Sequence, residues 1–189
     1  MATTQPIRSK KKVRELAGYY LRLKEPRNYA LIVLGVYTAL RVSDLLRLSW
    51  SDVYDFKNRR VLGSFTISEK KTGKRKTVSL NRAAIAAVCA LLSPRAVPGA
   101  PLFRSRKTGR AISRVQAYRI IRAAADALEM ERVSCHSLRK TFGYHAWKSG
   151  VSPAVIMEIY NHASFAVTRR YLGVTRDDTD RVYLGLSLM

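Results

Sequence analysis

The core of the fold is predicted by residues 26–48, PRNYALIVLGVYTALRVSDLLRL. Apolar side chains fill 27–40 almost without interruption. They predict a buried helix that begins at Pro26, because proline is favoured in the first helical turn. Three leucines then predict a short second helix over 43–48. The nearly apolar run over 29–40 is twelve residues long, which is too short to cross a bilayer, so the segment indicates the interior of a soluble protein.

Most of the other segments also predict helices. Apolar residues recur at three- and four-residue steps over 11–24, as they do on one face of a helix. Asn81 and Ser113 are favourable N-caps, and the pair Ser152-Pro153 places a proline at the first helical position. We expect further helices over 82–92, 114–128, 136–149, from 153 onward and, after the capping pair Thr175 and Asp178, over 176–186.

One region of the sequence is typical of strands. VLGSFTI (61–67) and KRKTVSL (74–80) flank EKKTG, whose Thr72-Gly73 pair predicts a tight turn. Nothing in the sequence divides the chain into two units. We therefore expect a mainly α-helical domain with one small antiparallel β-sheet (an α+β fold), formed by residues 1–189 with a basic tail over 1–10.

The charge of the chain points to a polyanionic partner. Among 189 residues, 35 Lys and Arg stand against 13 Asp and Glu, a net charge of +22. Such an excess repels itself unless a polyanion is present, and nucleic acid is the first candidate. The basic residues recur at 10–12, 59–60, 70–76, 104–110 and 169–170, which favours a folded phosphate-binding surface over a charged tail. The alternatives are a solvated basic surface and a membrane-surface protein.

Several other classes of protein are disfavoured. Hydrophobic residues make up 47% of the chain, too many for a disordered protein. The N-terminus MATTQPIRSKKK lacks the apolar stretch of a secretory signal, so we expect a soluble, cytoplasmic protein. Cys89 and Cys135 form no CxxC pair, which leaves a disulfide framework or a zinc ribbon unsupported. Cys89 lies in an apolar run, and we expect it to be a small core residue.

Two segments place polar groups where a helical core does not need them. In TALRVSDLLRL, Arg41 ends the long apolar helix and Asp44 follows three residues later. Arg41 is either a functional cation or a structural partner of Asp44. In EKKTGK, Lys70, Lys71 and Lys74 crowd a hairpin tip, which can enter a groove or make only non-specific phosphate contacts.

Two further segments, CHSLRKTFGYH and YNHASFAVTRRYLG, each combine a histidine with a second candidate. His136 and Arg139 are three residues apart, so on a helix they share one face and can bind one anion. An isolated HxxR pattern is common, however. His162 and Tyr171 lie in the second segment, where Tyr171 is also consistent with the buried face of an amphipathic helix. The three histidines of the chain lack the close spacing of a zinc site.

Taken together, these groups fit phosphoryl transfer without a metal. Arginine binds the non-bridging phosphate oxygens and stabilises the charge of the transition state. A tyrosine, with an ordinary pKa of about 10, needs such a cationic site and a base to attack phosphorus. A lysine on a hairpin can protonate the leaving alkoxide. Because the sequence shows no carboxylate cluster, a magnesium nuclease is disfavoured, and we expect no metal or other cofactor.

The order and spacing of the four segments resemble those of the phage integrase family, the tyrosine site-specific recombinases. His136 precedes Arg139 by three residues, His162 follows Arg139 by 23, and Tyr171 follows His162 by nine. The resemblance covers about residues 12–184 and implies the mainly helical catalytic-domain fold of that family.

The resemblance also implies roles for the cationic residues. Arg41 and Arg139 would bind the scissile phosphate, and Asp44 would support the active site. Lys71, which precedes Thr-Gly, would be the general acid on the hairpin. Lys70 beside it is an alternative for this role.

For the remaining residues, the resemblance implies the following roles. His136 would act as a base or hydrogen-bond partner, and His162 would hold the phosphate. Tyr171 would be the nucleophile, forming a 3′-phosphotyrosyl bond and releasing a 5′-hydroxyl, so that religation needs neither ATP nor metal. The family often has Gly before the second histidine, where this chain has Asn161.

The implied function is site-specific DNA recombination (integration) on double-stranded DNA, in a mobile genetic element of bacterial or phage origin. The alternatives are a catalytically idle DNA-binding regulator on the same fold, relaxation of the type IB topoisomerase kind, and a basic RNA-binding protein. We expect Lys70 and Lys74 to contact DNA. The basic helix 114–127 would enter a major groove with Arg114, Arg119 and Arg122.

The resemblance carries expectations about assembly as well. Only 40 residues precede Arg41, so we expect a catalytic domain without an N-terminal core-binding domain, either stand-alone or a fragment. We expect a monomer in solution that assembles on DNA as a tetrameric synapse. The C-terminal segment 176–189, with Val182, Leu184 and Leu186, either packs on its own domain or docks into a neighbouring subunit.

Overall fold

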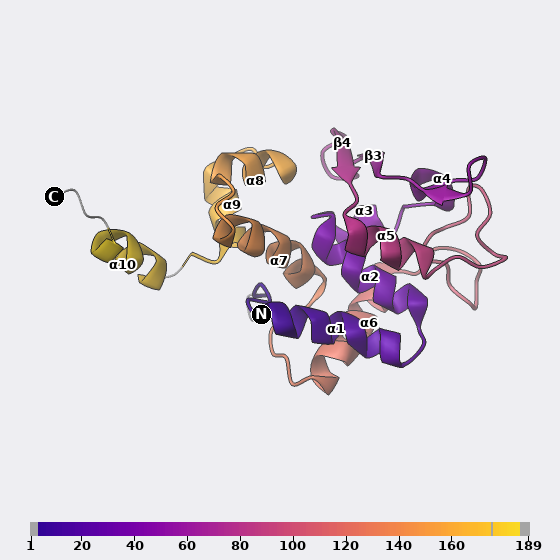
Figure 1. The fold of residues 1–189 in the computed structure, drawn as a ribbon, viewed down its shortest axis with the longest axis horizontal. Coiled ribbons are helices and arrows are strands. Elements are labelled where there is room, and N and C mark those ends of the chain that lie inside the picture. Colours follow the sequence, from indigo (N-terminus) through magenta and orange to yellow (C-terminus); the bar gives the residue numbers. More distant parts are fainter. Residues whose placement is uncertain (1–3, 175, 186–189) are drawn as a thin grey trace.

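The computed structural model describes residues 4–174 and 176–185 of the chain. Its central helix is α2 (Pro26–Tyr37), which packs against α1 (Lys10–Arg22), α5 (Arg82–Cys89) and α7 (Cys135–Lys148) (Figure 1). Residues 30–36 are all buried, as expected for a helix that is apolar on every side. The helix ends three residues earlier than expected, because Ala39 adopts a left-handed backbone conformation with φ 55°.

Most of the other helices lie close to their expected positions. The expected ones are α3 (Val42–Leu45), α6 (Arg114–Ala127), α8 (Pro153–Ile159) and α10 (Arg176–Gly185), whereas α4 (Trp50–Val53) and α9 (Phe165–Leu172) were not expected. Two expected caps are confirmed, because the side chains of Asn81 and Ser113 accept hydrogen bonds from backbone N–H groups of the following turn. Pro153 is at the start of α8 as expected, and the side chain of Ser152 also caps that helix. Thr175 and Leu186 lie outside the described residues.

The expected hairpin is present. It consists of β3 (Ser64–Ser68) and β4 (Arg75–Ser79), which pair antiparallel, and Gly73 adopts φ 67° in the turn between them. A second two-stranded antiparallel sheet, β1 (Tyr54–Asp55) with β2 (Arg60–Val61), is an addition to the one expected. Strands of two residues are too short to show an alternating pattern in the sequence.

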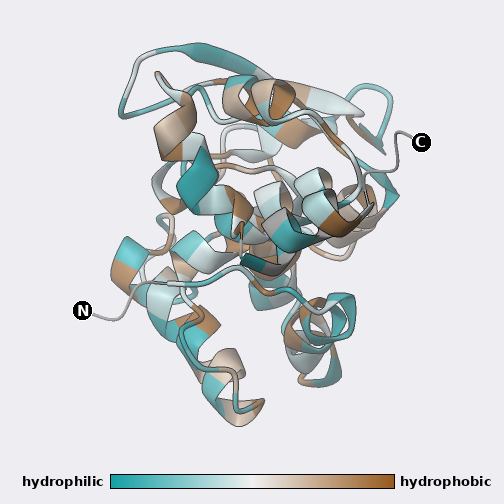
Figure 2. Cartoon of the chain, turned by 90° about the vertical axis from the view of Figure 1, so that its left-hand side faces the viewer, coloured by the Kyte–Doolittle hydropathy of each residue, from teal (hydrophilic) through white to brown (hydrophobic). Residues whose placement is uncertain are grey.

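Two hydrophobic clusters hold these elements together. The larger is centred on α2 and extends to the β3–β4 hairpin. The smaller contains Ala39, Ile156, Tyr160 and Leu172, and it joins α8 and α9 to the end of α2. Figure 2 shows hydrophobic and hydrophilic residues alternating along the helices, as expected when each helix buries one face.

The apolar segment around Cys89 does not place that residue in the core. Cys89 is exposed at the end of α5, so its assignment to the core is wrong. The buried residues of α5 are Ala84, Ala87 and Val88, and each further residue of a helix turns by about 100°, which carries Cys89 away from the core. Across the residues that the structure describes, no helix is long and apolar enough to span a membrane.

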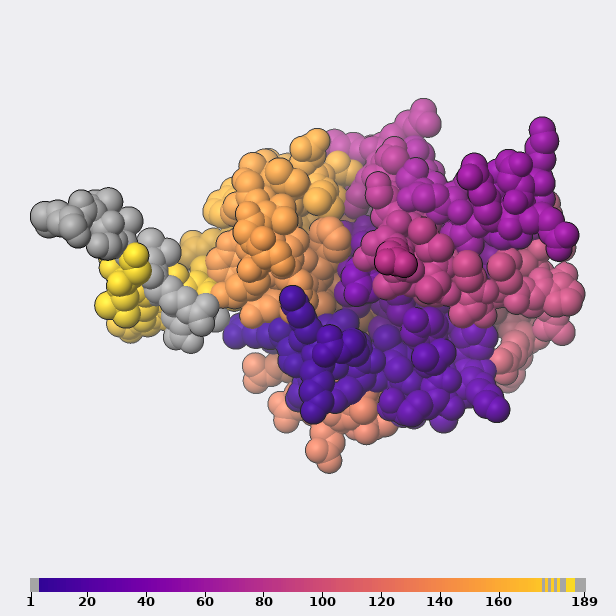
Figure 3. Space-filling model, in the orientation of Figure 1, coloured from indigo at the N-terminus to yellow at the C-terminus, as the bar shows by residue number. Residues whose placement is uncertain are grey.

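Helix α10 stands apart from the rest of the molecule (Figures 1 and 3). Lys148 at the end of α7 pairs with Asp178 and links the two helices. Tyr183 and Leu184 are 82% and 89% exposed. The described part of α10 therefore contributes to neither hydrophobic cluster.

Candidate active site

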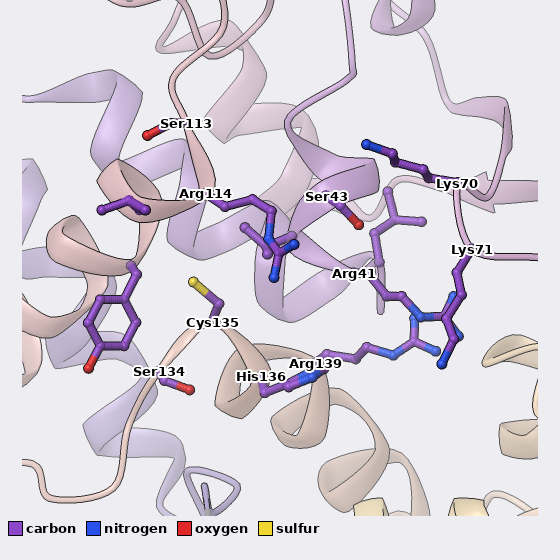
Figure 4. A pocket seen from close by; sticks show the side chains of 14 residues that line it. Arg41, Ser43, Lys70, Lys71, Ser113, Arg114, Ser134, Cys135, His136 and Arg139 are labelled. Atoms are coloured by element: carbon purple, nitrogen blue, oxygen red, sulfur yellow. The ribbon is translucent and has the colours of Figure 1, made fainter. Parts of the chain in front are cut away.

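Four separate segments meet at one cavity of about 1070 Å³. It lies between the start of α3, the β3–β4 turn and the first residues of α6 and α7 (Figure 4). In Figure 4 the guanidinium groups of Arg41 and Arg139 point toward the same end of the cavity, near Lys71. The structure thus gathers in one lining six residues that the sequence singled out: Arg41, Lys70, Lys71, Arg114, His136 and Arg139.

Arg139 is held from several sides and is only 1% exposed. It lies on the first turns of α7. Its Nη1 donates to the carbonyl of Ala39, and its Nη2 donates to the carbonyl of Tyr160 at 3.0 Å. The ring of Tyr160 lies 4.4 Å from its Cζ, a cation–π contact, and burial together with Arg41 lowers the pKa of Arg139. Nε is buried without a hydrogen-bond partner among the described residues, which leaves one donor for a ligand.

Arg41 comes directly before α3, in extended backbone that turns its side chain toward the cavity. Its Nη1 lies 2.9 Å from Oε1 of Glu69, a carboxylate that is 1% exposed. Asp44 is fully buried one turn later and does not pair with Arg41 in the structure. Instead, its Oδ1 accepts a hydrogen bond from the N–H of Lys70 at 2.8 Å. Asp44 therefore fixes the hairpin beside Arg41.

The two candidate histidines flank Arg139. His136 is the second residue of α7. His162 follows α8, and its Nδ1 lies 3.0 Å from Oγ1 of Thr168. Burial, together with Arg139 and Arg41, lowers the pKa of His162 to about 4. Burial, with Arg139 and Lys140, also lowers the pKa of His136. These surroundings favour the neutral form of both imidazoles, which has an unprotonated ring nitrogen.

Tyr171 lies on α9 with its ring among these groups. The ring centroid is 4.9 Å from that of His162, 5.1 Å from that of Tyr160 and 6.5 Å from that of His136. The guanidinium carbon of Arg139 lies 5.9 Å from the ring. The structure thus brings the candidate nucleophile of this chain to its own arginine and histidines.

The lysines of the hairpin differ in their surroundings. Lys70 and Lys71 are exposed and line the cavity, whereas Lys74 is exposed outside it. Lys76, which the sequence analysis did not single out, shares the inward face of β4 with Val78. Burial, with Arg139, lowers the pKa of Lys76 to about 8.

The three arginines of α6 that were expected to read DNA are not equivalent. Arg114 is exposed and lines the cavity, and Arg119 is exposed outside it. Arg122 pairs with Asp126 and donates to the carbonyl of Val133 at 3.0 Å. Its guanidinium is therefore engaged within the domain.

Glu69, Lys76 and Tyr160 belong to the site and were missed. Glu69 is the only acidic residue between Asp55 and Asp126 in a strongly basic stretch, which is a usable signal. Lys76 falls on the inward register of a strand, and a charge at such a position is uncommon. Tyr160 has no distinguishing signal, because its position matches an ordinary core residue.

Asn161 stands directly before His162, at the position where the family often has glycine. It adopts φ 52°, a left-handed conformation that asparagine tolerates better than most residues. Within the described residues, no group of three or more His, Cys, Asp or Glu side chains is placed to hold a metal ion.

Several known proteins resemble this chain in sequence. The family described as "Phage integrase family" matches residues 9–177. A Bacillus subtilis protein named "Probable integrase/recombinase YoeC" is 37% identical over 183 residues, 97% of each chain. "Tyrosine recombinase XerC" of Pelobacter propionicus is 31% identical over 167 residues, which are 84% of this chain and 53% of that protein.

Solved structures show the same fold. The crystal structure of XerA recombinase superposes with a TM-score of 0.78 at 23% identity, covering 97% of this chain and 66% of that one. XerH site-specific recombinase, bound to a palindromic difH substrate, gives 0.75 at 20% identity, covering 97% and 53%. The fold is that of the catalytic part of tyrosine recombinases, as expected.

The chain belongs to the phage integrase family. It covers nearly the full length of the Bacillus subtilis relative and about half the length of the XerC relative. The enzyme class expected from the sequence, an integrase or tyrosine recombinase, is confirmed by the family and by the names of these relatives.

Proposed function

We propose that this chain cuts and rejoins strands of double-stranded DNA through a covalent bond to Tyr171. The observation that carries the proposal is the position of the Tyr171 ring, 4.9 Å from His162 and 5.9 Å from the guanidinium carbon of Arg139. A phenol beside a buried guanidinium and neutral imidazoles has the groups that attack on phosphorus requires.

The reaction is a transesterification in which bonds are exchanged one for one. Oη of Tyr171 forms a bond to the scissile phosphorus, and the bond from phosphorus to the 5′ oxygen breaks. Neutral His136 accepts the tyrosine proton, while Lys71 protonates the departing 5′ oxygen. Arg41, Arg139 and His162 hold the non-bridging oxygens as charge develops on them. Reversal of these steps on a new 5′-hydroxyl rejoins the strand without ATP or metal.

A series of three basic cavities supports DNA as the partner. The active-site cavity shares Ser113 with a second of about 560 Å³, which shares Ser105 with a third of about 460 Å³. The described residues that line them include no Asp or Glu. The cations of the second and third cavities are Arg110, Arg27, Arg95, Arg104 and Arg106. A cationic track of this kind matches the phosphate backbone of a duplex that extends beyond the cleavage point.

The solved relatives give this partner a precedent. The XerH structure holds its difH substrate, and a lambda integrase dimer is bound to a COC′ core site. For this chain we propose a monomer in free solution and a tetrameric synapse on DNA, formed in the bacterial cytoplasm. The exposed Tyr183 and Leu184 of α10 support docking of that helix into a neighbouring subunit.

The test is to trap the covalent intermediate. Wild type, Tyr171→Phe and the matched control Tyr183→Phe are incubated with nicked duplexes from the DNA flanking the gene, in the presence of EDTA. The expected result is a DNA–protein adduct on denaturing gels with wild type and the control only. If all three proteins bind the DNA and none of them forms an adduct, the result would support an idle regulator. Relaxation of plasmids that lack the site would support a topoisomerase.

A further inference from the structure

Glu69 is a buried carboxylate at the edge of the proposed phosphate site. Its side chain is 1% exposed, and its Oε1 lies 2.9 Å from Nη1 of Arg41. The proposed chemistry uses no acid at this position. A buried charge is costly unless it is paired, so its retention here needs a reason.

Glu69 also organises the turn that carries Lys71. Its Oε2 accepts a hydrogen bond from Oγ1 of Thr72 at 2.8 Å. Its backbone carbonyl accepts from the N–H of Gly73 at 2.8 Å, and its own N–H donates to the carbonyl of Lys74 at 3.0 Å. Lys71 therefore lies inside a turn that Glu69 closes with both its backbone and its side chain.

Asp44 contacts the same turn. Its Oδ1 accepts from the N–H of Lys70, and it lies three residues after Arg41. The backbone just before Lys71 is thus fixed between two buried carboxylates. Glu69 is also the ion-pair partner of Arg41, so it connects the turn that holds Lys71 to one of the two arginines of the proposed phosphate site.

The charges around Glu69 keep it in place. Burial raises the pKa of Glu69, but the hydrogen bond from Thr72 and the charge of Arg41 outweigh this effect and leave the pKa below its ordinary value. Lys76 is a third cation of the cluster, and its Nζ makes no hydrogen bond within the described residues. Glu69 and Asp44 are the carboxylates that lie close enough to affect Lys76. Removing the charge of Glu69 leaves these cations with less compensation.

We propose that Glu69 is a positioning residue that sets the place of Lys71 relative to Arg41. One carboxylate oxygen fixes the arginine, and the other fixes the turn through Thr72. This inference rests on the proposed function, in which Lys71 protonates the 5′ oxygen as its bond to phosphorus breaks. Glu69 acts through Lys71 and does not touch the DNA.

The test separates proton donation from every other step. In one nicked duplex, sulfur replaces the bridging 5′ oxygen at the cleavage point. The leaving group is then a thiolate, which is stable near neutral pH and needs no acid. Rates of adduct formation on oxygen and sulfur substrates are measured for wild type, Glu69→Gln, Thr72→Val and Lys71→Ala. Thr66→Val is the matched control, because within the described part of the chain Oγ1 of Thr66 bonds only to Oγ1 of Thr77, on the exposed face of the same hairpin.

The expected result is a selective loss. Glu69→Gln lowers the rate on the oxygen substrate by about tenfold to a hundredfold, a fraction of what a general acid contributes. Its loss on the sulfur substrate is smaller, because only the changed contact with Arg41 affects that reaction. Thr72→Val also loses more rate on the oxygen substrate than on the sulfur substrate, but the loss is smaller than in Glu69→Gln. Because Thr72→Val removes only the hydrogen bond to Glu69 in the turn, it tests the role of the turn even if Glu69→Gln does not fold. The control is unchanged on both substrates.

Two other outcomes carry distinct meanings. Equal losses on both substrates, or no loss in Glu69→Gln and Thr72→Val, would overturn the positioning role while leaving the proposed function intact. Absence of any adduct with wild type on either substrate would refute the proposed function and this inference together.

Discussion

Gly143 is the position at which a single added methyl group has the clearest consequence. It lies in the middle of α7, and a Cβ there would stand 2.4 Å from Oη of Tyr160 and 3.0 Å and 3.1 Å from two carbons of its ring. Ordinary contacts between carbon atoms are about 3.5–4.0 Å. Tyr160 is fully buried and lies against the guanidinium of Arg139, so the ring has no free space to enter.

The expected cost of Gly143→Ala combines three effects. Overpacking of a buried site costs about 1–3 kcal/mol. Displacing Tyr160 also loses the hydrogen bond from its Oη to the carbonyl of Arg139, worth about 1 kcal/mol. The higher helix propensity of alanine returns about 1 kcal/mol. We therefore expect a net loss of about 1–3 kcal/mol in the free energy of unfolding, with slower adduct formation because Arg139 shifts with the ring.

The assay is urea denaturation followed by tryptophan fluorescence, together with adduct formation on the nicked duplex. Gly18→Ala is the matched control, because a Cβ at this position of α1 meets only a flexible arginine end at 3.4 Å. It should gain up to about 1 kcal/mol. Combining Gly143→Ala with Tyr160→Phe removes the closest overlap and should restore part of the loss. Wild-type stability and activity in Gly143→Ala would refute this account of the packing behind Arg139.

Two further predictions concern the histidine and the arginines. The pKa of His162 is lowered to about 4 in the folded chain and returns to about 6.5 on unfolding, so the unfolded chain binds more protons between these values. Stability should fall by about 1–2 kcal/mol from pH 6.5 to pH 4, allowing for solvent screening. Urea denaturation at a series of pH values should show that the free energy of unfolding falls less with decreasing pH in His162→Gln than in wild type. The same pH dependence in both proteins would contradict the lowered pKa of His162. Arg114→Ala should weaken DNA binding and reduce by about 1 the slope of the logarithm of the binding constant against the logarithm of the salt concentration. Arg122→Ala should leave that slope unchanged, because the guanidinium of Arg122 is paired with Asp126. An equal change of the slope in the two variants would contradict the assignment of Arg114, and not Arg122, to DNA contact.

The sequence was sufficient to predict the elements whose signals are local. The apolar run of α2, the caps Asn81 and Ser113 and the Thr72-Gly73 turn each depend on neighbouring residues, and the structure has them. The short β1–β2 pair has no such pattern. The exposure of Cys89 depends on its angle around α5, which an apolar run does not specify.

The candidate site divides in the same way. Arg41, His136 and Arg139 could be selected because their spacing in the sequence follows a family pattern. The contacts of Glu69 and Tyr160 join residues that are distant along the chain, Glu69 with Arg41 and Tyr160 with Arg139. Such pairings arise from tertiary packing and have no counterpart in local sequence. The engagement of Arg122 by the carbonyl of Val133 is another example, and it separates Arg122 from Arg114 on the same helix.

The central claim is that Tyr171 forms the bond to DNA, and peptide mapping of the adduct tests it most directly. Trypsin cleaves after Arg170 and Arg176 and releases the peptide YLGVTR, which begins at Tyr171. After nuclease trimming, mass spectrometry of the wild-type adduct should find the remaining nucleotide on this peptide, linked through its 3′-phosphate. A nucleotide on the peptide that contains Tyr160 or Tyr183, or one linked through a 5′-phosphate, would contradict the account.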